Sequence, residues 1–109
     1  MRKRYGTICA ACGLSIPGLI DAAHIIPDSE NGTNDSRNGL PLCPTHHRAF
    51  DNGHFIIHPT THQIFATNES PTLNDLGITQ RDLSNLADTP HAEALTWRWN
   101  NSKNTPFPL

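Results

Sequence analysis

Two pairs of metal-binding side chains with the same spacing constrain this chain more than any other feature of its sequence. Cys9-x-x-Cys12 and Cys43-x-x-His46 each leave two residues between their members. One turn of chain can present both members of such a pair to a single ion, and residues 13–42 leave room for a hairpin and a loop between the pairs. Three thiolates and one imidazole complete a closed tetrahedral shell, which predicts a structural zinc (Zn²⁺) site.

The composition shows why such a site would matter to folding. The chain has 109 residues, of which 36% are hydrophobic, and its mean hydropathy is −0.47. A core this small is marginal by itself, whereas the free energy of metal binding becomes free energy of folding. We therefore expect a single domain over residues 1–109, with a zinc-bearing core in 1–58 and a C-terminal extension in 59–109.

The three cysteines allow other interpretations. They could be small buried apolar residues, or Cys9-x-x-Cys12 could be a redox pair, although no βαβ pattern surrounds it. An odd number of cysteines, and a basic N-terminus with no apolar segment after it, favour a reducing, cytoplasmic location over secretion. No stretch approaches the ~18 apolar residues of a membrane span, so no membrane association is expected.

The rest of the pattern predicts short helices and strands. A strand over residues 19–26 ends at Pro27, and a bridging strand covers 40–42. A helix over 44–52 has Pro44 at its first position and Gly53 just past its end. Two further strands are expected over 55–57 and 63–65, and helices over 79–87 and from 89 to about 99. Residues 28–39 and 100–109 are expected to be irregular, so the fold class is α+β.

A second group of polar residues lies among these elements. His24 sits inside an apolar strand, where an imidazole needs a partner or a task. His47 directly follows His46, and neighbouring helical side chains project about 100° apart, so the two rings cannot easily serve one ion. Asp51 lies four residues further on, on the same helical face as His47. That pair either chelates a second divalent ion with open positions or is an ordinary surface pair.

These residues carry a resemblance to the HNH endonuclease family. The resemblance is to the zinc-bearing, restriction-type branch and covers about residues 5–58, where the two interleaved ligand pairs match the zinc-bearing members. Three segments carry it: Ala22-Ala23-His24-Ile25-Ile26-Pro27, then Asn38-Gly39-Leu40-Pro41-Leu42-Cys43-Pro44-Thr45-His46-His47, then Phe50-Asp51-x-Gly53. The later hairpin and Trp97-Arg98-Trp99 resemble the end of that branch only loosely. Trp97 and Trp99 are expected to pack in the core and between subdomains rather than to stack on bases.

The resemblance implies a ββα-metal core of the HNH or His-Me finger type, followed by a small C-terminal β-hairpin and helices. It implies a metal-dependent DNA endonuclease of restriction or phage type that hydrolyses phosphodiester bonds. His24 would be the general base, because a neutral imidazole is available at pH 7–8 when its ordinary pKa is about 6.5. Asn38 would brace the loop around it, and His47 and Asp51 would hold one catalytic Mg²⁺, Mn²⁺ or other transition ion.

One position departs from the family pattern. Many members place a metal-binding Asp or His directly before the general base, and this chain has Ala23 there. Asp21 lies two residues earlier, on the same strand face as Ala23, and is the residue that could compensate.

The charge balance shapes the expectation for DNA binding. The formal net charge is −2, so binding must rest on local charge and bound metal. The basic residues expected to contact the DNA backbone, each of which could equally be a solvated surface charge, are Arg2, Lys3, Arg4, Arg37 and Arg48. A homodimer, or fusion to a specificity domain, is compatible with the absence of a recognisable specificity module.

Two other functions remain open from the sequence. A zinc knuckle that binds nucleic acid or protein without cutting would fit the near-neutral charge and Ala23. A toxin-type nuclease with an immunity partner is a third possibility, although no delivery segment is evident.

Overall fold

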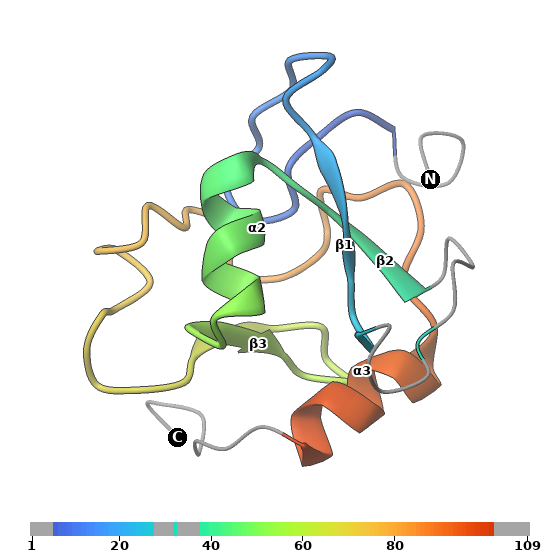
Figure 1. Ribbon diagram of the computed structural model, residues 1–109, viewed down its shortest axis with the longest axis vertical. Coiled ribbons are helices and arrows are strands. Elements are labelled where there is room, and N and C mark those ends of the chain that lie inside the picture. The colour runs from blue at the N-terminus through green and yellow to red at the C-terminus, as the bar shows by residue number, and fades with distance from the viewer. Residues whose placement is uncertain (1–5, 28–31, 33–37, 102–109) are drawn as a thin grey trace.

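The computed structural model describes residues 6–27, 32 and 38–101 (Figure 1). The elements it defines, in chain order, are β1 (Asp21–His24), β2 (Gly39–Leu42), α2 (Pro44–Asp51), β3 (Phe55–Ile57), β4 (Ile64–Ala66) and α3 (Ala92–Asn100). The strands form two antiparallel pairs, β1 with β2 and β3 with β4. The fold is therefore a small α+β domain, as the sequence predicted.

The first strand pair and α2 form a ββα arrangement. Asp21 pairs with Leu42 and His24 pairs with Gly39, so the two strands run antiparallel with no bulge. Helix α2 begins directly after β2, with Pro44 in its first turn, and packs against β1 and β2. Pro44 suits that place because the first helical N–H has no partner within the helix. Gly53 follows the helix with φ +74°, a left-handed conformation that glycine adopts without strain.

The second strand pair and α3 complete the domain. Helix α3 lies against β3, and its Trp99 ring makes edge contacts with His58 and Phe65 of the hairpin. Trp99 therefore packs α3 onto the hairpin, although its side chain is half-buried and lies outside the buried core.

One continuous core joins the two halves of the chain. The side chains of Phe50 and Phe55 are fully buried and lie with ring centroids 5.2 Å apart. Ile78, Leu83 and Leu95 belong to the same buried cluster as Cys9 and Leu40. Residues beyond 58 therefore contribute directly to the core that holds the ββα arrangement.

The prediction of a helix over residues 79–87 is wrong. The backbone N–H groups of Thr79 and Gln80 both donate to the carbonyl oxygen of Ala11, and the carbonyl of Arg81 accepts from Ile64 N–H at the edge of β4. Asp82 accepts from the backbone N–H of Ser84, and the hydrogen bonds from Ser84 hold the pKa of Asp82 below its ordinary value. These tertiary and local bonds use the backbone groups that a helix would need.

Several boundaries also differ from the sequence-based expectation. The strand expected over 19–26 is confined to β1, and α3 starts at Ala92 rather than at residue 89. His91 caps α3 because its side chain accepts from the backbone N–H of Glu93. Helix α3 also extends to Asn100, which was expected to be irregular. Within the described part of the chain, no helix is long or apolar enough to cross a bilayer.

Candidate functional site

The four side chains of the two pairs converge in the folded chain. One ligand atom from each of Cys9, Cys12, Cys43 and His46 lies within 4.8 Å of all the others. Cys9, Cys43 and His46 are buried, and Cys12 is half-buried. The Nδ1 atom of His46 lies 3.2 Å from the sulfur of Cys43 and 3.6 Å from that of Cys9. This donor set and spacing fit a tetrahedral zinc ion with no open position.

A backbone carbonyl from a distant segment sets the orientation of the His46 ring. Its Nε2 atom lies 2.8 Å from the carbonyl oxygen of Leu76. Because a carbonyl only accepts, Nε2 carries the proton and Nδ1 keeps its lone pair, directed toward the cysteine sulfurs. Metal-binding histidines in proteins are commonly held by such an outer partner. The sequence offered no signal for this contact.

The first cysteine pair sits on a tight turn, as the sequence predicted. Gly13 has φ +77°, and its N–H donates to the carbonyl of Cys9. The N–H of Cys9 donates to Leu14, and the N–H of Ala10 donates to Pro41 of β2. The turn is thus fastened to the strand that leads into the second pair.

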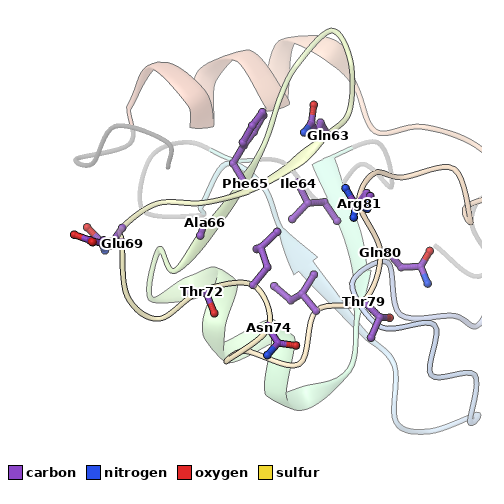
Figure 2. A pocket seen from close by; sticks show the side chains of 13 residues that line it. Gln63, Ile64, Phe65, Ala66, Glu69, Thr72, Asn74, Thr79, Gln80 and Arg81 are labelled. Atoms are coloured by element: carbon purple, nitrogen blue, oxygen red, sulfur yellow. The ribbon is translucent and has the colours of Figure 1, made fainter. Parts of the chain in front are cut away.

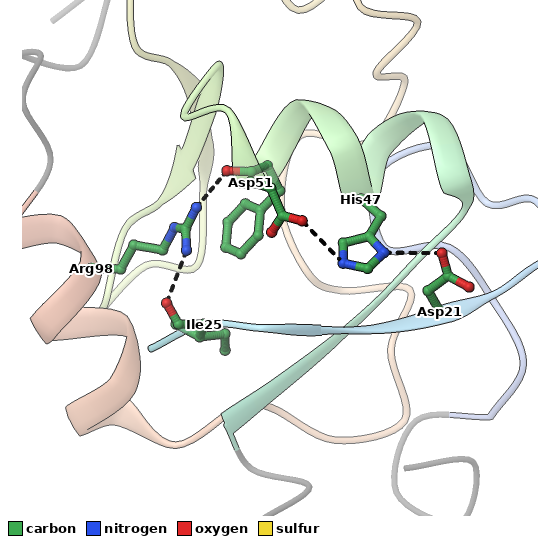
Figure 3. Close-up of polar contacts among 6 residues, drawn as sticks. Asp21, Ile25, His47, Asp51 and Arg98 are labelled. Atoms are coloured by element: carbon green, nitrogen blue, oxygen red, sulfur yellow. Dashed lines mark hydrogen bonds and ion pairs between the residues drawn. The ribbon is translucent and has the colours of Figure 1, made fainter. Parts of the chain in front are cut away.

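A second cluster is centred on His47, on the face of α2 that is turned toward β1 (Figure 3). Its Nδ1 atom lies 3.0 Å from a carboxylate oxygen of Asp21, and its Nε2 atom lies 3.3 Å from one of Asp51. The side chains are 30% exposed for His47, 45% for Asp21 and 58% for Asp51. The predicted His47–Asp51 pair is therefore brought together and left open to solvent on one side, and Asp21 joins it from β1.

The donor atoms of this cluster fit a bound cation on the Nε2 side of the His47 ring, next to Asp51. Carboxylates only accept hydrogen bonds, and a neutral imidazole has one N–H, so it can donate to Asp21 or to Asp51 but not to both. With the proton on Nδ1, facing the closer carboxylate of Asp21, the Nε2 lone pair and the Asp51 carboxylate form a two-ligand edge. The exposure of that edge leaves coordination positions for water and phosphate oxygens.

His24 and Asn38 lie at the end of the β1–β2 pair where the connection between the two strands begins and ends. His24 is the last residue of β1, three positions beyond Asp21, and is half-buried. Asn38 is buried, and its side-chain amide makes two hydrogen bonds with the same residue: its Oδ1 accepts from Ile26 N–H at 2.8 Å, and its Nδ2 donates to the Ile26 carbonyl at 3.0 Å. The backbone bracing predicted for Asn38 is present, two residues after His24.

Sequence reasoning missed Arg98 of α3. Its guanidinium donates to the carbonyl of Ile25 at 2.9 Å and to the carbonyl of Phe50 (Figure 3). It also lies over the Phe50 ring, 3.7 Å from the centroid. Burial lowers the pKa of Arg98 to about 10, while the charge of Asp51 acts in the opposite direction. The one available signal was a lone charge between Trp97 and Trp99 in an expected helix.

Most of the basic residues expected at the DNA backbone lie outside the described residues, namely Arg2, Lys3, Arg4 and Arg37. Arg48 is exposed on α2, next to His47 in sequence.

A separate hollow of about 950 Å³ lies beside β4 (Figure 2). Its walls come from the β3–β4 hairpin and from residues 68–81, with Phe65, Ile64 and Arg81 among them. Of the residues predicted to bind metal or DNA, none that the structure describes lines it. The hollow is therefore distinct from both clusters.

Comparison with known proteins agrees with this geometry. Residues 9–58 match the HNH endonuclease family. This segment contains the cluster of three cysteines and His46, and also contains His24, Asn38, His47 and Asp51. Residues 9–58 of the chain therefore belong to that family. A solved structure, that of the modification dependent TagI restriction endonuclease, matches with a TM-score of 0.68 and 21% sequence identity. The match covers 98% of this chain and 37% of the TagI chain, and at that identity it shows a shared fold. Comparison with curated protein sequences gave no match.

Proposed function

We propose that this chain is a metal-dependent DNA endonuclease that hydrolyses phosphodiester bonds, with His24 as general base and one catalytic divalent ion. The observation that carries the proposal is the placement of His47 between Asp21 and Asp51, on the helix of a ββα arrangement that belongs to the HNH endonuclease family. Restriction- or phage-type activity is part of the proposal, and the fold shared with a restriction endonuclease supports it.

In this proposal the two clusters have different tasks. Cys9, Cys12, Cys43 and His46 would hold a structural zinc ion, because their donor set is closed and mostly buried. His47 and Asp51 would hold the second, exchangeable ion. When bound, that ion supplies Lewis-acid stabilisation of negative charge on the phosphate oxygens.

Ala23 stands where many family members have a metal-binding Asp or His. Asp21 compensates for that difference by acting on His47 rather than by binding the ion itself. Its carboxylate accepts a hydrogen bond from Nδ1–H of His47, so Nε2 carries no proton and its lone pair is on the side of Asp51. A carboxylate in this outer position raises the basicity of the ligand and holds the ring in place. Asp21 is thus a positioning residue, and His47 and Asp51 are the protein ligands.

A ring nitrogen of His24 accepts a proton from the attacking water. An imidazole suits this step because its neutral form is abundant at pH 7–8. Asn38 keeps the chain after His24 in one conformation by bonding both the N–H and the carbonyl of Ile26. The partner is DNA, bound mainly through its phosphates, with Arg48 among the contacts.

Cleavage of supercoiled plasmid in Mg²⁺ or Mn²⁺ tests the proposal. The wild-type protein should convert the plasmid to nicked or linear form, and His24→Ala should remove that activity while keeping one zinc per chain. Activity that survives in His24→Ala would show that another group is the base.

The near-neutral charge of the chain and Ala23 favour one alternative, a zinc knuckle that binds nucleic acid or protein without cutting it. It predicts no cleavage, no bound divalent ion besides zinc, and unchanged binding in both His24→Ala and His47→Ala. Elemental analysis before and after mild chelation, with cleavage assayed on the same samples, separates the two functions.

A further inference from the structure

Helix α3 lies outside the segment that matches the family, yet one of its side chains reaches the ββα arrangement. Arg98 is half-buried, and its guanidinium bonds two backbone carbonyls that are far apart in sequence, those of Ile25 and Phe50. The planar group also stacks on the Phe50 ring. Three contacts with two segments hold this side chain in a single position.

The two carbonyls occupy special places relative to the proposed site. Ile25 directly follows His24, the proposed general base, at the end of β1. Phe50 directly precedes Asp51, the proposed metal ligand, at the end of α2. Figure 3 shows the guanidinium lying between the chain at Ile25 and the end of α2.

We propose that Arg98 is a positioning residue that sets the separation between the general base His24 and the metal ligand Asp51. This inference rests on the proposed function. A second tie, from Asp21 to His47, joins β1 and α2 three residues before His24. The Asp21–His47 contact and the Arg98 hydrogen bonds therefore connect β1 and the residue after it with α2 at two places. Two such connections leave little freedom for β1 to slide or rotate against α2.

The chemistry of arginine suits this task. Its rigid fork presents several N–H donors in one plane, so it can bond two carbonyls and stack on an aromatic ring at once. The three N–H donors of lysine share one nitrogen, so lysine cannot reach both separated carbonyls as the arginine fork does and cannot stack as a plane on the ring.

Burial lowers the pKa of Arg98, which indicates that the fold holds a positive charge at a solvation cost. An apolar side chain of similar length avoids that cost but also removes a donor to the Ile25 carbonyl, so the stability of each variant is measured beside its activity.

The test compares Arg98→Met and Arg98→Lys with Leu95→Ala, a control that loosens the same helix from its buried side. Each full-length variant is checked for one zinc per chain. Plasmid cleavage in Mn²⁺ is then measured well below the melting temperature, and Mn²⁺ affinity is measured by calorimetry without DNA.

Arg98→Met should lower kcat about 100-fold, the loss that a misplacement of about 1 Å can produce, with little change in KM for DNA. It should also weaken Mn²⁺ binding about 10-fold, as loss of support for a ligand does. Arg98→Lys should fall between Arg98→Met and the wild type, and Leu95→Ala should stay near the wild type in both measurements.

Equal losses in Arg98→Met and Leu95→Ala, or wild-type values in Arg98→Met, would overturn the inference while leaving the proposed function in place. If Arg98→Met does not retain zinc, Arg98→Lys takes its place in the comparison. Losses of kcat and Mn²⁺ affinity in Arg98→Lys that are no larger than those in Leu95→Ala would then overturn the inference. A wild-type protein that neither cuts DNA nor binds Mn²⁺ overturns the proposed function, and the inference falls with it.

Discussion

The Nε2 atom of His46 lies 2.8 Å from the carbonyl oxygen of Leu76, thirty positions further along the chain. This bond connects a metal-binding side chain of the family segment to a loop of the C-terminal extension. It fixes which nitrogen of His46 faces the cysteines. The extension therefore helps to position the cluster of three cysteines and His46 as well as to form the core.

Removal of zinc should unfold the domain. The hydrophobic core is small, and structural zinc in short domains contributes on the order of 10 kcal/mol to folding. Treatment with a strong chelator should abolish the cooperative thermal transition and the near-ultraviolet circular dichroism, and added Zn²⁺ but not Mg²⁺ should restore both. A metal-free protein that still melts cooperatively at the same temperature would contradict a structural role for the ion.

Gly77→Ala should loosen zinc by disturbing the carbonyl of Leu76. Gly77 has φ +73°, so alanine there strains the peptide bond whose carbonyl, that of Leu76, bonds His46, while the added carbon would lie at an ordinary contact distance of 3.8 Å from Nε2. Gly53→Ala is the matched control, because Gly53 has φ +74° and nothing within 4 Å of the added carbon. Both variants should lose about 1–2 kcal/mol of stability from the left-handed backbone. Only Gly77→Ala should transfer zinc to a competing chelator faster, and equal transfer rates would argue against the role of Leu76.

Much of the site could be predicted because its information is local in sequence. The spacing of Cys9 with Cys12, and of His47 with Asp51, follows from turn and helix geometry alone. Asn38 could be assigned a bracing role because an amide both donates and accepts. For these residues, type and spacing are enough to predict which side chains come together.

The rest depends on contacts that leave no pattern in the sequence. The partners of His46 and Arg98 are backbone carbonyls, which every residue has. Residues 79–82 carry a helix-capping pattern, but their backbone groups bond to Ala11 and Ile64, so a helix does not form. Asp21 could be placed on one strand face, whereas its contact with His47 depends on how α2 packs against β1.

Asn38→Asp should impair cleavage more than folding. The change keeps the acceptor for Ile26 N–H but replaces the donor to the Ile26 carbonyl with an oxygen that repels it. We expect a stability loss of about 1–3 kcal/mol from the unsatisfied buried groups, and a loss of about 10-fold or more in kcat from displacement of His24. Asn68→Asp, the same chemical change at an exposed position, should be silent in plasmid cleavage and thermal melting. Full activity in Asn38→Asp would show that the brace is dispensable.

Asp21→Ala should weaken the second ion without affecting zinc. Loss of the carboxylate frees the Nδ1 side of His47, and loss of such an outer partner typically costs 10- to 100-fold in metal affinity. Mn²⁺ titration should show this decrease, and Asp51→Ala, which removes a proposed ligand, should show a larger one. Glu69→Ala removes an exposed carboxylate elsewhere and should leave Mn²⁺ affinity unchanged. If Asp21→Ala binds Mn²⁺ as tightly as the wild type, the carboxylate does not set the ring orientation.

Arg48→Ala should reduce the dependence of DNA binding on salt. Arg48 is exposed on α2 directly after His47, and although its side chain projects about 100° from that of His47, we propose that its length lets it contact a neighbouring phosphate of the same DNA. Each lost phosphate contact lowers the slope of log K against log salt by about 0.9 for duplex DNA. Binding measured in Ca²⁺ across a salt series, to prevent cleavage, should show this change equally for DNA fragments of different sequence. Arg81→Ala removes an exposed arginine that lines the separate hollow and should keep the wild-type slope. Identical slopes for Arg48→Ala and the wild type would place the DNA away from this face of α2, because a charge next to the reacting phosphate cannot be electrostatically silent.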